Sequence, residues 1–138
     1  LVDRLYINDG TGNFKKSENN GLQALPNSSA VARTIDINGD GALDLFVGSR
    51  LIPFVYGVNA SSHILVNDGK GKFTDRTEQF APELKEIGMV TDAQVVDYDG
   101  DGKTDLVLVG EWMAPTFFRN TGTKLEKIEM PEMASHKG

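Results

Sequence analysis

The sequence predicts an all-β protein made of repeated four-stranded antiparallel units. The first observation is an acidic nine-residue loop that occurs twice, at residues 36–44 and 97–105, displaced by 61 residues. The second is an Asn-Asp-Gly turn between short apolar runs, which recurs at a similar interval. The third is the composition: 15 glycines and few long helical patterns favour short strands joined by turns.

The first predicted element is a hairpin. Residues 3–8 alternate roughly between polar and apolar side chains, as a strand does, and residues 8–12 read Asn-Asp-Gly-Thr-Gly. These residue types tolerate the positive φ that hairpin turns require. A return strand starts at Asn13, and the Ser-, Asn- and Pro-rich residues 17–29 are interpreted as a connection.

A complete four-stranded unit is expected over residues 30–76. A short strand at 31–35 enters the first acidic loop, and an apolar run at 45–47 leaves it without polar alternation, which indicates a strand covered on both faces. A long connection with several aromatic residues follows at 49–63. Residues 64–73 then repeat the opening hairpin.

Most of a further unit is expected over residues 90–128. One helical turn near Pro82 precedes it, and its predicted parts are a strand, the second acidic loop, a strand, a connection at 111–116 and a weaker hairpin. A four-stranded antiparallel unit repeated about every 60 residues is typical of a β-propeller blade. Residues 3–17 are then the end of a preceding blade. Residues 1–138 would form about two and a half blades of one larger propeller domain.

Each acidic loop gathers carboxylates that repel one another unless a cation binds between them. Ca²⁺ takes six to eight oxygen ligands and accepts several of them from one short loop. The loops therefore predict two structural Ca²⁺ ions. The predicted ligands are the side chains of Asp36, Asn38, Asp40 and Asp44 with the carbonyl of Ala42, and the side chains of Asp97, Asp99, Asp101 and Asp105 with the carbonyl of Lys103.

Three other interpretations of these loops compete with the calcium prediction. An EF-hand-like loop needs an acid at its twelfth position, where this chain has Val47 and Leu108, and flanking helices, where the flanks resemble strands. Mg²⁺ is disfavoured because it prefers octahedral sites with several waters. A solvated turn without metal is the remaining alternative.

Charge and composition exclude several classes of function. The net charge is −6, and seven of the 20 acidic residues lie in the two loops, so two bound Ca²⁺ ions would leave −2. The sequence has no stripe of basic residues, so it gives no indication of nucleic-acid binding. No apolar run approaches the ~20 residues that span a bilayer, and the absence of cysteine excludes disulfides and thiolate metal sites.

Two copies of one motif carry a family resemblance: Asp36-x-Asn38-x-Asp40-Gly41-x-x-Asp44-Leu45 and its repeat from Asp97 to Leu106. Gly48 and Gly110 end the strands that follow. With these residues the sequence resembles the FG-GAP/VCBS repeats, which are related to integrin α-subunit head domains, and its overall pattern looks like that of exported bacterial members. The resemblance implies a seven-bladed propeller with Ca²⁺ between the first two strands of a blade. It also implies an extracellular, cell-surface or periplasmic location and a role in adhesion or ligand binding.

The connections at 49–63 and 111–116 are expected on the face opposite the acidic loops. There Arg50, Tyr56 and Trp112 are candidate ligand contacts, because Arg, Tyr and Trp are common binding anchors. A second interpretation of Phe54 and Trp112 is that they pack between blades, and the sequence leaves both open.

These observations predict a non-enzymatic, calcium-binding module that recognises a protein or a glycan. Its other predicted partner is the rest of its propeller or a second copy. The histidines, His63 and His136, have no Ser or Cys partner in a recognisable catalytic motif. The alternative is the propeller part of a secreted polysaccharide-degrading enzyme such as a lyase, and a purely structural spacer is a third possibility.

Overall fold

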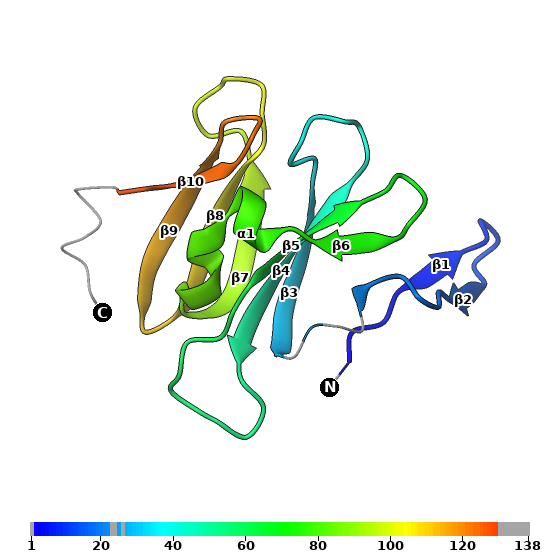
Figure 1. Ribbon diagram of the computed structural model, residues 1–138, viewed down its shortest axis with the longest axis horizontal. Coiled ribbons are helices and arrows are strands. Elements are labelled where there is room, and N and C mark those ends of the chain that lie inside the picture. The colour runs from blue at the N-terminus through cyan, green and yellow to red at the C-terminus, as the bar shows by residue number, and fades with distance from the viewer. Residues whose placement is uncertain (1, 23–24, 26, 130–138) are drawn as a thin grey trace.

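The computed structural model describes residues 2–22, 25 and 27–129. Within these ranges the chain is nearly all β, with a two-stranded hairpin followed by two four-stranded antiparallel sheets (Figure 1). The predicted all-β class with four-stranded units is confirmed. His136, one of the two histidines considered above, lies outside the described residues.

Both four-stranded sheets are meanders, in which the order in space follows the order in sequence. The hairpin consists of β1 (Tyr6–Asn8) and β2 (Phe14–Lys16). The first sheet consists of β3 (Ser28–Ile35), β4 (Asp44–Leu51), β5 (His63–Asn67) and β6 (Phe73–Asp75). The second sheet consists of β7 (Met89–Val96), β8 (Asp105–Glu111), β9 (Met113–Asn120) and β10 (Leu125–Ile128).

The segment between the sheets holds two short helical pieces, α1 (Thr77–Phe80) and the 3₁₀ helix η2 (Pro82–Glu86). The sequence predicts a single turn there. Pro82 separates the two pieces because a residue before proline is disfavoured in the α conformation, and Ala81 is indeed extended, with φ −159°. Together the two pieces bury Phe80 and Leu84.

The predicted connection at 111–116 is wrong. The strand β8 ends at Glu111 and β9 begins at Met113, so only Trp112 lies between them. Pro115 lies within β9, where the ladder between β8 and β9 shifts register between Leu108 and Gly110. A proline, which has no N–H to donate, is tolerated at such an irregularity.

The second sheet packs through β7 against β3 and β4 of the first. The shared core includes Phe46, Leu106, Leu108 and Phe118, all fully buried. Gly48 lies at the contact, where an added Cβ would come within 2.7 Å of Val31 Cγ1 and 2.9 Å of Val90 Cγ1. The absence of a side chain at Gly48 therefore allows the sheets to approach this closely.

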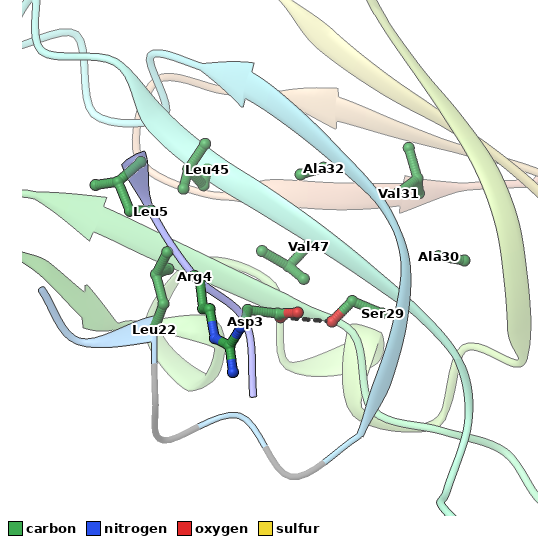
Figure 2. Close-up of a pocket in the computed structure, with 10 residues that line it drawn as sticks. All are labelled: Asp3, Arg4, Leu5, Leu22, Ser29, Ala30, Val31, Ala32, Leu45 and Val47. Atoms are coloured by element: carbon green, nitrogen blue, oxygen red, sulfur yellow. Dashed lines mark hydrogen bonds between the residues drawn. The ribbon is translucent and has the colours of Figure 1, made fainter. Parts of the chain in front are cut away.

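The other face of the first sheet carries a groove of about 360 Å³ between residues 3–5 and the strands β3 and β4 (Figure 2). Leu45 and Val47 line it. When Asp44 is aligned with Asp105, they correspond to Leu106 and Leu108, which the first sheet covers completely. A neighbouring unit of the same repeat would lie over this groove in a larger propeller. That larger propeller, with blade bounds at 3–17, 30–76 and 90–128, stays a prediction.

Candidate functional site

The two acidic loops have one conformation, which their own side chains maintain. Asp36 accepts hydrogen bonds from the backbone N–H groups of Gly39 and Gly41, at 2.8 and 3.0 Å. Asp97 accepts the equivalent bonds from Gly100 and Gly102, at 2.8 and 2.9 Å. The four glycines have positive φ between 72° and 86°, a region that glycine enters without steric cost. Both loops connect the first two strands of their sheets.

Asp44 and Asp105, the last aspartates of the loops, are fully buried at the start of β4 and β8. Both oxygens of Asp44 accept backbone bonds, Oδ2 from Ile37 at 3.0 Å and Oδ1 from Asn67 at 2.8 Å. Burial raises the pKa of Asp44, although these two hydrogen bonds act in the opposite direction. In the second loop, Asp105 accepts the same two bonds from Tyr98 and Asn120, at 3.1 and 2.7 Å.

Asn67 and Asn120 connect each acidic loop to the hairpin beside it. The side-chain amide of Asn67 donates to the carbonyl of Leu43 at 3.0 Å, and its Oδ1 accepts from Gly69 and Gly71 within the hairpin. Asn120 donates to the carbonyl of Thr104 at 3.1 Å. Neither asparagine was predicted as a site residue. The sequence does contain a clue to both. The third hairpin, at residues 120–122, lacks the Asp of the Asn-Asp-Gly motif but keeps its Asn and Gly.

The donor set of the second loop fits a hard cation such as Ca²⁺. In the second loop, Asp97, Asp99 and Asp105 offer carboxylate oxygens that all lie within 4.8 Å of one another. Oxygen donors that converge within one short loop match the ligand type that Ca²⁺ prefers. The predicted ligands occupy two loops: Asp36, Asn38, Asp40, Ala42 and Asp44 in the first, and Asp97, Asp99, Asp101, Lys103 and Asp105 in the second.

The two loops are neighbours in space. A cavity of about 330 Å³ lies between them, with Asp36, Ile37 and Gly39 on one side and Gly102 and Lys103 among the residues on the other. Figure 1 shows both loops, in cyan and yellow, at the same end of the two sheets. The charges of one loop therefore act close to those of the other.

The opposite end of the sheets brings together the three predicted ligand contacts, Arg50, Tyr56 and Trp112. Glu111 joins them, and we call these four residues the rim cluster. Arg50 forms an ion pair with Glu111, and the hydroxyl of Tyr56 donates to Glu111 Oε2 at 3.0 Å. This hydrogen bond raises the pKa of Tyr56. The rings of Tyr56 and Trp112 meet edge to face, with centroids 5.6 Å apart.

Trp112 and Phe54 point outward at the tips of their turns. The exposed fraction of Trp112 is 76 %, and Phe54 is fully exposed. Both have positive φ, 57° for Trp112 and 66° for Phe54, a conformation that is uncommon for bulky residues. Neither ring is therefore buried between the two described sheets, and the interpretation that Phe54 and Trp112 pack between blades of a larger propeller stays a prediction.

His63 forms a separate polar cluster at the start of β5. Its Nδ1 lies 2.9 Å from Asp75 Oδ2, and Asp75 Oδ1 accepts from both the N–H and the hydroxyl of Thr77. Thr77 Oγ1 in turn accepts from the N–H of Ile64 at 2.9 Å. The cluster thus connects β5, β6 and the beginning of α1, and its contacts describe a structural network.

We expect the Asp75 cluster to make stability depend on acid pH. Burial alone would raise the pKa of Asp75, but the hydrogen bonds from His63 and Thr77 outweigh it and hold this pKa well below 3.8. A depressed carboxyl pKa stabilises the fold above its unfolded value, and this contribution is lost as the pH falls through the folded value. Replacing Asp75 with Asn should therefore flatten the fall of the melting temperature below about pH 4. Equal pH profiles for both proteins, measured by thermal unfolding from pH 2 to 7, would contradict this.

Two successive four-stranded meanders, each with an acidic loop between its first two strands, define a β-propeller-type repeat domain. The FG-GAP-like repeat model matches residues 2–47 and 54–108, so the chain belongs to the FG-GAP-like repeat family. Neither the curated proteins nor the solved structures give a significant match to it. Such repeats are typical of extracellular or cell-surface proteins. Among the described residues, no helix has the length and apolar character needed to cross a membrane.

Proposed function

We propose that the chain is a non-enzymatic recognition module of an exported or cell-surface protein, in which the rim cluster binds a protein or glycan ligand. The observation that carries this proposal is the meeting of Arg50 and Tyr56 at the carboxylate of Glu111, with the ring of Trp112 against that of Tyr56. These three residue types dominate binding energies at interfaces. Loops on a rigid scaffold are also the usual place for binding residues.

The rim cluster combines an open aromatic surface with polar groups of fixed position. Tyr56 is 62 % exposed and its ring contacts that of Trp112, while Glu111 pairs with both the Tyr56 hydroxyl and the Arg50 guanidinium. Little side-chain entropy is then lost when a ligand binds, which favours affinity. The positive φ of Trp112 supports a functional role, since strained backbone is concentrated at binding and catalytic sites.

Calcium has a structural role in this proposal. Two Ca²⁺ ions would bind at the acidic loops, with the side chains of Asp36, Asn38, Asp40 and Asp44 and of Asp97, Asp99, Asp101 and Asp105, together with the carbonyls of Ala42 and Lys103. The bound ions neutralise carboxylate repulsion where each loop joins its first two strands. They lie at the end of the sheets away from the rim cluster, so they support the scaffold and do not contact the ligand. The rest of a propeller, over the groove at Leu45 and Val47, is the proposed second partner.

A glycan array and a panel of purified extracellular proteins, probed with and without Ca²⁺, test the recognition function. For any ligand found, we expect Trp112→Ala to weaken binding by about tenfold or more, as for an aromatic anchor. The matched control is Phe14→Ala, because Phe14 is also exposed, at 65 %, but lies on the β1–β2 hairpin. Binding that survives Trp112→Ala and Tyr56→Ala together unchanged would overturn the assignment of the rim cluster.

A further inference from the structure

The two acidic loops differ in formal charge at two equivalent positions, and the strand beside each loop differs in charge at a third. Asn38 of the first loop corresponds to Asp99, and Ala42 corresponds to Lys103. The third pair is Val66 and Arg119. Each of these precedes the asparagine whose backbone N–H bonds to the buried aspartate of its loop, Asn67 to Asp44 at 2.8 Å and Asn120 to Asp105 at 2.7 Å.

The second loop carries its own cations. Arg119 Nε lies 2.7 Å from Asp99 Oδ2, and its Nη2 lies 3.5 Å from Asp101 Oδ2. Lys103 Nζ lies 3.0 Å from the same Asp101 oxygen. The side chains of Asp99 and Asp101 are only 23 % and 22 % exposed beside these cations. Asp99 is the carboxylate that the second loop has in excess of the first, and it is the one that forms an ion pair with Arg119 Nε.

A count of carboxylates alone would make the second loop the more negative of the two, but these ion pairs reverse that order. The first loop has three aspartates and a formal charge of −3. The second has four, but Lys103 and Arg119 reduce its charge to −2. A fixed positive charge a few ångströms from a divalent ion opposes its binding, and a carboxylate oxygen paired to arginine is less available as a ligand.

We propose that Arg119, aided by Lys103, makes the two calcium loops unequal: the first loop binds Ca²⁺ more tightly, and the second is partly neutralised by its own cations. This inference rests on the calcium part of the proposed function. Arg119 is exposed on β9 and Lys103 is partly exposed in the loop, so neither is needed for the core. The second loop consequently depends less on calcium for its order than the first.

Site-resolved calcium titration of the chain by ¹⁵N NMR tests the inference, because the amides of Gly41 and Gly102 report the two loops separately. In the native chain we expect the Gly41 resonance to titrate at lower Ca²⁺ than that of Gly102. Arg119→Gln should lower the Ca²⁺ concentration at the midpoint of the Gly102 titration by about threefold to tenfold. The midpoint for Gly41 should stay within about twofold of its native value. Arg119→Lys, which keeps the charge, should resemble the native chain.

The outcomes separate the inference from the calcium proposal itself. If Gly41 responds but the midpoint of Gly102 does not fall in Arg119→Gln, the role of Arg119 is wrong while calcium binding stands. A Gly102 midpoint at or below that of Gly41 in the native chain also overturns the inequality. If neither glycine responds up to about 10 mM Ca²⁺, well above the range for extracellular modules, the calcium proposal fails and the inference fails with it.

Discussion

Replacing Asp44 with Ala is expected to lower the free energy of unfolding by about 3–5 kcal/mol, even without calcium. Asp44 is fully buried, and both carboxylate oxygens accept backbone N–H groups, from Ile37 and Asn67. An alanine leaves these two donors unpaired, and each buried unsatisfied group costs about 1–3 kcal/mol. The loss also separates the acidic loop from the hairpin at Asn67. Denaturant unfolding in EGTA measures the effect.

Asp40→Ala is the matched control for this experiment. Asp40 belongs to the same loop and is a predicted calcium ligand, but its side chain is exposed, and its Oδ1 accepts from the N–H of Ala42 within the loop. In EGTA we expect Asp40→Ala to cost about 1 kcal/mol or less, as for other exposed polar contacts. The loss of unfolding free energy for Asp44→Asn should lie between those of the two alanine variants, because asparagine retains one acceptor oxygen. Equal losses for Asp44→Ala and Asp40→Ala in EGTA would show that the buried bonds contribute little.

The local parts of this fold could be predicted from the sequence. The acidic loops and hairpins are built by bonds over two to five residues, such as those from Gly39 and Gly41 to Asp36 and from Gly69 to Asn67. A motif of Asp, Asn and Gly specifies such turns almost alone. The four-stranded units could be predicted because these motifs repeat at a nearly fixed interval.

The parts that the sequence did not reveal depend on contacts between distant residues. Asp44 and Asn67 are 23 residues apart, while Asp105 and Asn120 are 15 apart, so no common spacing marks the bond they share. Arg119 lies in a strand and reaches Asp99 only after β9 pairs with β8. Trp112 was placed in a longer connection by analogy with residues 49–63 of the first unit, and the pairing of β8 with β9 shows that the second unit lacks such a connection.

In the rim cluster, too, the sequence predicted the individual residues but not the contact between them. Arg50, Tyr56 and Trp112 were predicted from residue type and loop position, but Glu111 is the group that joins Arg50 to Tyr56, whose ring contacts Trp112. A glutamate at the end of a strand carries no such signal in the sequence. Its role depends on the two sheets packing side by side, which brings the end of β8 next to the connection that follows β4.

Adding Ca²⁺ is expected to raise the melting temperature of the chain, and chelation with EGTA to reverse the rise. A ligand that binds only the folded state stabilises it by RT ln(1 + [L]/Kd). With Kd values of about 10⁻⁴ M for the first loop and about 10⁻³ M for the second, within the range of extracellular modules, about 10 mM Ca²⁺ contributes about 4 kcal/mol in total. For a chain of this size, that corresponds to a rise of roughly 15 °C.

The size of the calcium effect also depends on which loop is altered. Asp36→Ala removes a ligand of the loop proposed to bind more tightly, so it should abolish more of the calcium-dependent rise than Asp97→Ala does. Both aspartates accept the same pair of glycine bonds, so their calcium-independent costs are matched. Equimolar Mg²⁺ at constant ionic strength is the control for non-specific screening of the loop charges. A melting temperature that is the same in Ca²⁺, Mg²⁺ and EGTA would contradict a structural role for calcium. The acidic loops would then be self-sufficient turns, held by the backbone hydrogen bonds that Asp36, Asp44, Asp97 and Asp105 accept.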